Sequence, residues 1–351
     1  MEYSSEMTGT ATQERVERAR MLAQAGREAE TRGALADSLE MLRTALEVLP
    51  DEERGPLRAD ILRWLGTTLR ERGDTTEAEA AYRQSWDVAS AAGYRTGEAH
   101  ALNCLAIIAQ RRGAVDEAAV RYRQAARLAK EARDHRLTGM IEQNLGVLAN
   151  IQGDLDAALV RYRASLRAFE EASYEEGMSW VLNNLGMLHS DLGRFDEAES
   201  YFLQGMAIAR RRDDLHTEAL LQSNLAEVYL GLGRLDAAQS AVDRTLQIAE
   251  ARGDPLRRGD ALKFGAMVAR RRGESERARD MLEEAVRIAT DHEDTLLQAE
   301  TLRELAEAHA DLGDLASARD HLRAAIDLFR ELNAGLDASR AEDRLNQLEA
   351  H

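Results

Sequence analysis

Eight glycines recur at intervals of forty residues along this chain of 351 residues. They are Gly33, Gly73, Gly113, Gly153, Gly193, Gly233, Gly273 and Gly313. A period of this length, held without slippage over most of a chain, is typical of a solenoid, in which one supersecondary unit stacks on copies of itself. Solenoids present extended surfaces to binding partners. The spacing therefore constrains the fold more than any other feature of the sequence.

Three further columns keep a fixed distance from each glycine. Seven residues before it stands a small residue: Gly26, Gly66, Ala106, Gly146, Gly186, Ala226, Ala266 or Ala306. Five residues after it stands alanine in seven of the eight repeats, with Ser38 as the exception. Nine residues after it stands a large apolar residue: Leu42, Tyr82, Tyr122, Tyr162, Phe202, Val242, Leu282 or Leu322. Small residues let two helices approach closely, and we expect the large column to fill the space between one helical pair and the next.

The repeated glycine is expected just past a helix C-terminus, where the left-handed backbone conformation favours glycine. Three residues later stand residues that we predict to cap the following helix: Thr76, Asp116, Asp156, Asp196 and Asp236. The remaining apolar residues follow helical spacing, and no segment alternates as a strand would. Each repeat is therefore predicted to be a helix A, a tight turn and a helix B.

These columns resemble the tetratricopeptide repeat. The Leu-Gly pair of that family's helix A occurs at Leu65-Gly66, Leu145-Gly146 and Leu185-Gly186. The usual unit has about 34 residues, and longer helices account for the forty found here. The lengthened form is similar to repeats of kinesin light chains, of bacterial peptide-pheromone receptors and of helical sensor regions in bacterial transcriptional regulators. A HEAT or armadillo array can have the same period, but the glycine, alanine and aromatic columns argue against it.

The resemblance implies an all-α fold, a right-handed superhelical solenoid of eight helical hairpins whose inner wall is lined by helix A. We place this solenoid at residues 13–335. Residues 1–12 are aperiodic and are predicted to be a disordered tail. Residues 336–351 are predicted to form a C-terminal capping helix that covers the last exposed core face.

The amino-acid composition limits which partners the protein can bind and in which compartment we expect it. The formal net charge of −17 argues against nucleic acid, because a phosphate backbone would be repelled. A single cysteine, Cys104, allows no internal disulfide and fits a reducing cytoplasm. We find no signal peptide and no apolar stretch long enough to cross a membrane, so we expect a cytoplasmic protein without a membrane partner.

Motifs for catalysis are missing from the sequence. The eight histidines include no pair at the i, i+3 or i, i+4 spacing of a helical zinc motif. Neither Lys130 nor Lys263 follows a glycine, as a phosphate-binding P-loop requires, and no Gly-x-Ser-x-Gly elbow occurs. We therefore predict no catalytic residue, no metal site and no cofactor.

The A-helix columns nine, ten and thirteen residues before each glycine carry the candidate binding residues. In the middle repeats they hold neutral amides and hydroxyls flanked by large side chains. Carboxamides can bond both N–H and C=O groups of an extended peptide, which gives affinity with little demand on its sequence. The alternative is that these amides bond a neighbouring helix. The candidate peptide-binding residues are Asn103, Met140, Gln143, Asn144, Trp180, Asn183, Asn184, Leu220, Ser223 and Asn224.

Two other features of these columns leave alternatives open. Trp180 is either an anchor for a ligand in the groove or a side chain inserted between adjacent helices. Three cations in the column ten residues before the glycine each follow an acid by three residues, which favours salt-bridged helix surface over a clamp for an acidic peptide. These pairs are Asp60 with Arg63, Asp260 with Lys263, and Glu300 with Arg303.

The sequence therefore predicts a non-enzymatic scaffold or adaptor that binds a protein or extended peptide in the concave groove of repeats three to six. The alternative is a regulatory receptor or sensor module that binds a peptide and controls a transcriptional or signalling effector protein. Self-association through the end repeats is a further possibility.

Overall fold

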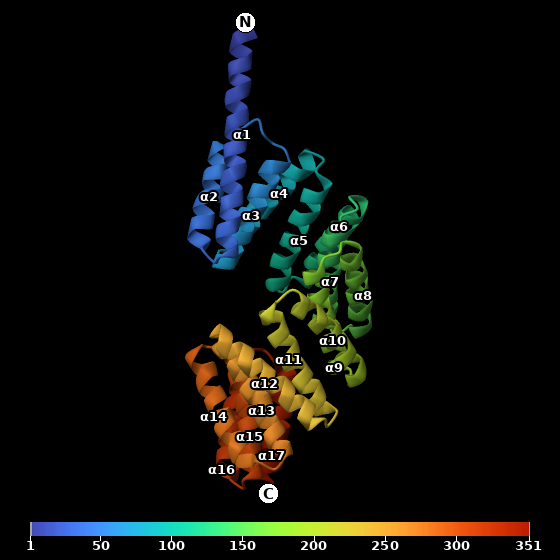
Figure 1. The fold of residues 1–351 in the computed structure, drawn as a ribbon, viewed down its shortest axis with the longest axis vertical. Coiled ribbons are helices and arrows are strands. Elements are labelled where there is room, and N and C mark those ends of the chain that lie inside the picture. Colours follow the sequence, from blue (N-terminus) through green and yellow to red (C-terminus); the bar gives the residue numbers. More distant parts are fainter. Residues whose placement is uncertain (1, 351) are drawn as a thin grey trace. The chain divides into compact units, whose positions relative to one another are not determined.

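The computed structural model describes residues 2–350, with side chains described from residue 12 onward. This part of the chain forms seventeen α-helices and contains no strand (Figure 1). The chain divides into two compact units, Met1–Gly177 and Met178–His351, and each is described by itself below. The prediction of an all-α repeat fold is confirmed.

Unit 1 contains eight complete helices and the start of a ninth. They are α1 (Glu2–Thr31), α2 (Leu35–Val48), α3 (Pro56–Arg72), α4 (Thr75–Ala91), α5 (Arg95–Arg111), α6 (Val115–Glu131), α7 (His135–Ile151), α8 (Leu155–Glu171) and α9 (Glu175–Asp191). From α5 to α8 every helix has 17 residues and every turn has three. Two such helices and two such turns make up the forty-residue period, so the lengthened repeat comes from longer helices.

Unit 2 continues from α9 with the same alternation. Its helices are α10 (Phe195–Arg211), α11 (Leu215–Gly231), α12 (Leu235–Arg252), α13 (Pro255–Arg271), α14 (Ser275–Asp291), α15 (Thr295–Asp311), α16 (Leu315–Glu331) and α17 (Gly335–Glu349). The last of these packs against α16 and buries Ala341 and Leu348 beside Leu322 and Ile326. A helix therefore lies where the C-terminal segment was expected, and its role as a cap stays a prediction.

The glycine column has the conformation that its spacing predicts. All eight glycines have positive φ, between 69° at Gly193 and 97° at Gly73. At Gly153, the backbone N–H donates to the carbonyl of Asn150 at 2.9 Å, and that of Asp154 donates to the carbonyl of Ala149 at 2.9 Å. These bonds close the end of helix A and turn the chain sharply into helix B.

The small and large columns meet inside each repeat. A Cβ atom added to Gly146 would lie 2.6 Å from the ring of Tyr162, and one added to Gly186 would lie 2.4 Å from the ring of Phe202. Both aromatic rings belong to helix B of the same repeat, and both are buried. The large column therefore packs first against its own helix A, rather than only between one pair and the next as we had expected.

The predicted capping residues are wrong by two positions. Helix B begins two residues after the glycine, so the cap position is the residue directly after the glycine, and among the described B helices a side-chain cap bond forms there only in α8 and α16. Asp154 accepts a hydrogen bond from the N–H of Ala157 at 3.0 Å, and Asp314 accepts one from Ser317 at 3.1 Å. Asp156, one of the expected caps, lies inside the first turn of α8, where its charge favours the helix dipole instead.

Within each unit, the A helices form the more closely packed layer. In unit 1, α3 contacts α5 and α5 contacts α7; in unit 2, α11 contacts α13 and α13 contacts α15. Successive B helices of the described chain make no contact of comparable extent. Closer spacing on one side of a stack curves it toward that side, so the A helices line the inner face of each unit.

The N-terminal segment differs from its prediction. Residues 1–12 were expected to be disordered, but α1 begins at Glu2, so residues 2–12 continue its backbone; residue 1 lies outside the described residues. This segment contains no proline that would stop a helix propagating back from the packed part of α1.

Candidate binding site on the A helices

The candidate binding residues divide between the two units. In unit 1, Asn103 lies on α5 and is buried, whereas Met140, Gln143 and Asn144 on α7 are half-buried. In unit 2 the members are two buried residues (Asn183 and Ser223), three half-buried residues (Asn184, Leu220 and Asn224) and Trp180. Trp180 is the most exposed of the set, at 39%. The column ten residues before the glycine is buried at Asn103, Asn183 and Ser223, whereas Gln143 is half-buried like its neighbour Asn144.

The amides form the same pair in each unit. The Nδ2 of Asn144 donates to the Oδ1 of Asn103 at 3.0 Å, and the Nδ2 of Asn224 donates to the Oδ1 of Asn183 at 2.7 Å. Each pair joins one A helix to the A helix of the preceding repeat. A carboxamide has two N–H donors and two acceptor sites on its oxygen, so Asn144 and Asn224 keep one N–H and the carbonyl oxygen for another partner. The pairing therefore orients these amides without using up their capacity.

A cavity of about 420 Å³ opens on the inner face of unit 2 beside Asn224. Leucines supply its apolar wall, and side chains from α11, α13 and α15 and from the turns before them complete it. Its lining comprises His216, Leu220, Asn224, Asp254, Leu256, Arg257, Asp260, Asp294, Leu296, Leu297 and Glu300. Leu296 is 49% exposed, which leaves a large apolar side chain facing solvent at the rim. The structure thus brings two of the predicted residues, Leu220 and Asn224, into one cavity.

The carboxylates of this cavity have two different structural roles. Asp254 and Asp294 cap α13 and α15, and each accepts the backbone N–H three residues later, at 3.0 and 2.9 Å. Asp260 and Glu300 stand one helical turn before the amide columns and hold Lys263 between them, at 3.1 and 2.6 Å. Four carboxylates therefore surround the cavity, against one arginine and one histidine in its lining.

Lys263 is a buried cation that these carboxylates keep charged. Its side chain is 9% exposed. Burial alone would lower the pKa of Lys263, but the carboxylates of Asp260 and Glu300 outweigh burial and raise that pKa. The ammonium is consequently held by these two carboxylates behind the cavity lining and is not available to an acidic ligand.

The predicted salt-bridged pairs are largely found. Arg63 contacts Asp60 at 3.1 Å, and Lys263 contacts Asp260. Arg303 instead contacts Glu304 at 3.6 Å and Asp337 at 3.4 Å, because Glu300 is engaged by Lys263 of the preceding A helix. Contacts between neighbouring repeats thus replace one of the three pairs expected within a helix.

The inner face of unit 1 has a different character. The guanidinium of Arg27 lies 5.0 Å from the ring centre of Trp64, and that of Arg63 lies 5.5 Å from it. Burial, and secondarily the charges of Arg63, Arg136 and Arg27, lower the pKa of His100 to about 3. His100 is therefore neutral at physiological pH, so the positive charge here belongs to the arginines. Cys104 lies in the same region, and burial raises the pKa of its thiol, which agrees with an unreactive filler.

Sequence reasoning missed several residues that line the cavity of unit 2. Leu256 and Leu296 stand seventeen residues before the repeat glycine, one helical turn beyond the last column that we had considered. His216 occupies the same column. Extending the inner-face columns by one more turn would have revealed them, because residues three or four apart share one face of a helix.

Two further searches cover only the described part of the chain. Among the side chains of residues 12–350, no group of three or more histidines, cysteines, aspartates or glutamates is arranged to hold a metal ion. No helix described in the structure combines the length and the apolar character needed to cross a bilayer.

Comparison with solved structures supports the fold. The apo form of the quorum sensor NprR from B. thuringiensis has a TM-score of 0.70 with 16% identity, over 89% of this chain and 87% of that one. BtubC (BKLC) from P. vanneervenii has a TM-score of 0.55 with 24% identity, over 64% of this chain and 91% of that one. A Rap protein complexed with Competence and Sporulation Factor has a TM-score of 0.56 with 17% identity, over 90% of this chain and 80% of that one.

Comparison at the level of sequence identifies the repeat. No curated protein matches the chain significantly. The sequence model described as tetratricopeptide repeat matches residues 97–171, 143–211, 177–251, 217–291 and 265–331, and a second model of the same description matches residues 23–93. These matches cover well over half of the chain and coincide with the helical hairpins described above. The chain therefore belongs to the tetratricopeptide repeat family.

Proposed function

We propose that this protein is a non-enzymatic scaffold or adaptor that holds an extended peptide, or an extended segment of another protein, on the inner face of its A helices. The observation that carries the proposal is the cavity of unit 2, where Leu220 and Asn224 meet the exposed Leu296. An apolar wall with a few convergent polar groups is the usual composition of a ligand site, and a volume near 420 Å³ lies within the usual range of about 300–1,000 Å³.

The groups in this cavity correspond to different parts of a peptide. The leucines suit one apolar side chain, and the free N–H and carbonyl of Asn224 suit the peptide backbone. The surrounding carboxylates suit a lysine or arginine next to the apolar residue, because opposite charges steer association and fix orientation. The proposed ligand of unit 2 is therefore a segment with adjacent apolar and basic side chains.

The inner face of unit 1 supports the same kind of binding with a second set of amides. Asn144 keeps donor and acceptor capacity after its bond to Asn103, and Met140 and Gln143 lie half-buried beside it. A single cysteine and a partner of this kind suit a role in the cytoplasm.

Selection of peptides from a random displayed library on the full chain tests the proposal. Affinities of the selected peptides would be measured by fluorescence anisotropy for the wild type, Leu220→Ala and Asn224→Ala. Each substitution is expected to weaken binding by about tenfold, which corresponds to about 1.4 kcal/mol. Gln247→Ala is the matched control, because Gln247 is an exposed carboxamide on α12 of the same unit and does not line the cavity.

The two variants separate ligand contact from folding. Asn224→Ala also removes the bond to Asn183, so its melting temperature must be compared with that of the wild type. Leu220→Ala leaves that bond in place. If the selected peptides bind Leu220→Ala and Asn224→Ala as tightly as they bind Gln247→Ala, the inner face of unit 2 is not the peptide site.

A second candidate is a regulatory receptor, in which a bound peptide alters the conformation and so the affinity for an effector protein. The relatives named as a quorum sensor and as a Rap protein complexed with Competence and Sporulation Factor favour this candidate. Small-angle scattering separates the two: a receptor is expected to become more compact when a selected peptide is added, and a passive scaffold is expected to keep its radius of gyration.

A further inference from the structure

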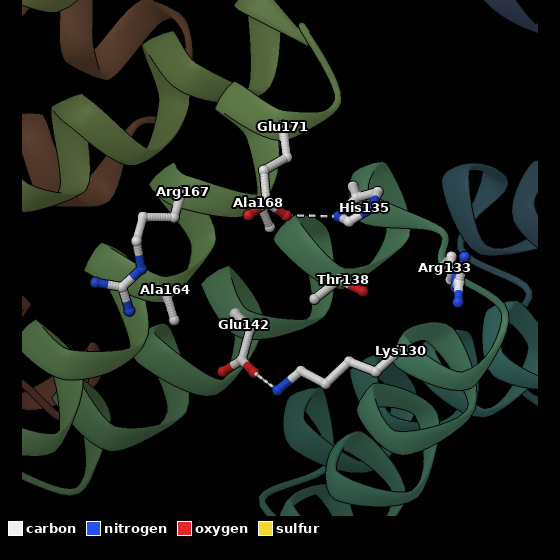
Figure 2. Close-up of a pocket in the computed structure, with 9 residues that line it drawn as sticks. All are labelled: Lys130, Arg133, His135, Thr138, Glu142, Ala164, Arg167, Ala168 and Glu171. Carbon is white, nitrogen blue, oxygen red and sulfur yellow. Dashed lines mark hydrogen bonds and ion pairs between the residues drawn. The ribbon is translucent and has the colours of Figure 1, made fainter.

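A second open cavity lies in unit 1. It is formed by the end of α6, the first turns of α7 and the end of α8 (Figure 2). Its volume is about 260 Å³, and Ala164 and Ala168 leave room because their side chains are short. A neighbouring cavity of about 390 Å³ shares Lys130 and Glu142 with it, so the two form one groove lined by α6, α7 and α8.

The charge of this groove is opposite to that of the whole chain. Lysine and arginine total 46 in the sequence against 63 aspartates and glutamates. In the groove the balance is reversed, with twice as many lysines and arginines as glutamates. The cations are Arg123, Arg127, Lys130, Arg133, Arg161 and Arg167, and the acids are Glu131, Glu142 and Glu171.

Two acids of the groove, the buried Glu142 and the exposed Glu171, already have partners. Glu142 is 2% exposed, and its two oxygens accept hydrogen bonds from Lys130 at 2.8 Å and from Arg161 at 2.9 Å. The cluster of one carboxylate and two cations therefore has a net charge of +1. Glu171 contacts the Nδ1 of His135 at 2.6 Å, as Figure 2 shows.

Two arginines at the rim have no such partner. Arg133 and Arg167 are exposed, and within the described chain neither makes an ion pair with a carboxylate. Figure 2 shows them on opposite sides of the cavity, Arg133 in the turn before α7 and Arg167 on α8. Both guanidinium groups are therefore available to an anion in the groove.

The cations are not a general property of the repeat. Basic residues are favoured near any helix C-terminus, and such a preference would apply equally to every repeat. Forty residues further on, however, the positions of Lys130, Arg133 and His135 hold Glu170, Ser173 and Glu175, and the position of Arg167 holds Ala207. Single cations do recur elsewhere, at Arg210 and Arg330 in the column of Lys130 and at Arg127 and Arg287 in that of Arg167. No other repeat has a basic residue at the position of Arg133, so the combination of cations is specific to this junction.

We propose that this groove binds a phosphate monoester between Arg133 and Arg167. A phosphate monoester carries a charge of about −1.5 to −2 at neutral pH and has three terminal oxygens, so it can satisfy two guanidinium groups at once. A carboxylate has one charge and two oxygens, which a single arginine fork can occupy. The two unpaired arginines and the spare charge of the Lys130–Glu142–Arg161 cluster match the dianion. The ester is either a phosphorylated side chain of a protein or a phosphorylated small molecule.

Calorimetric titration of the full chain at constant ionic strength tests this proposal. The probes are the blocked peptide acetyl-Gly-phosphoserine-Gly-amide and glycerol 3-phosphate, with the unphosphorylated peptide and its aspartate analogue as comparisons. We expect saturable binding of at least one phosphorylated probe and none of the unphosphorylated peptide. Tight binding of the peptide alone identifies a phosphoprotein segment as the source, and equal binding of glycerol 3-phosphate identifies a small molecule.

The substitutions are Arg133→Gly and Arg167→Ala, singly and together. Arg133 has a φ of 54°, so glycine removes the charge without imposing backbone strain. Each change is expected to weaken binding by about tenfold, or about 1.4 kcal/mol. Arg163→Ala is the matched control, since Arg163 is an exposed arginine one turn earlier on α8 and does not line the cavity.

Three results would overturn the proposal: no saturable binding of either phosphorylated probe, an equal loss in Arg163→Ala, or equal affinity for the aspartate peptide. Arg167→Gln replaces Arg167→Ala if the melting temperature of the latter falls. Because the groove shares no residue with the proposed peptide site of unit 2, failure of one proposal leaves the other intact.

Discussion

At the scale of single residues, the turn glycines test the link between sequence and backbone conformation most directly. Gly153 has a φ of 77°, and a Cβ added to it would meet nothing within 4 Å. Gly153→Ala should therefore lower the free energy of unfolding through backbone strain alone, by about 1–2 kcal/mol. Urea unfolding would measure this loss. Gly335→Ala is the control, because Gly335 also has open space around it but lacks a positive φ, and an equal loss there would contradict the argument.

The same turns show where residue-level prediction succeeds and where it fails. The spacing of Gly153 and its counterparts was sufficient to predict their conformation, because few residues other than glycine tolerate positive φ. It was not sufficient to tell Asp154 from Asp156 as the helix cap. Acidic residues are favoured both at a cap and in the first turn of a helix, so composition alone does not separate the two positions.

At the scale of helices, a buried glutamate links two consecutive B helices in unit 2. Glu218 on α11 has a side chain that is 4% exposed, and it binds Arg210 of α10 at 3.1 Å and Arg244 of α12 at 3.0 Å. Burial acts to raise the pKa of Glu218, but hydrogen bonds from Arg244 and Arg210 prevail and lower it from its ordinary value of 4.5. These contacts tie α10 and α12 to the α11 helix that lies between them in the sequence.

This lowered pKa makes a prediction about pH. Since the folded state holds the charged form more tightly than the unfolded chain does, Glu218 contributes stability above about pH 4.5, and the contribution is lost as the pH falls below that value. Wild type should exceed Glu218→Gln by about 1.5–3 kcal/mol at pH 7. The difference should shrink toward zero at pH 3 in thermal or urea unfolding. A difference that is unchanged by acid, or equal to that of the exposed Glu197→Gln, would show that the charge is not responsible.

Contacts between helices of neighbouring repeats also explain which parts of the binding site the sequence did not reveal. The residue types of the amide columns were visible, but the bond from Asn144 to Asn103 depends on how two A helices cross, and spacing along the chain does not determine that. Spacing also did not reveal that Glu300 pairs with Lys263 of the preceding A helix instead of with Arg303. Whether the remaining amide groups contact a peptide stays a prediction.

At the scale of the whole molecule, the dominant property is a net charge of −17. Most ion pairs of the described chain are exposed, and such pairs contribute only about 0–1 kcal/mol each. Repulsion among the excess carboxylates should therefore outweigh them, and the melting temperature at pH 7 should rise as salt shortens the Debye length from about 30 Å at 0.01 M to about 8 Å at 0.15 M. Near the isoelectric point of about 5.0 the rise should disappear. A melting temperature that falls with salt at pH 7 would show that ion pairs dominate.

Because the helices and turns have nearly the same lengths in every repeat of unit 2, a whole repeat can be removed there without changing the packing of the others. In unit 2, Arg234 and Glu274 both stand at the junction between a repeat glycine and helix B. Deletion of residues 235–274 would therefore join two equivalent points and remove one helix of each kind, so that α11 would meet α14 as it now meets α12. A deletion shorter by a few residues would leave extra residues at the junction and disturb the packing of α14 on α11. Gain or loss of binding surface in this lineage is thus expected to occur in whole steps of forty residues.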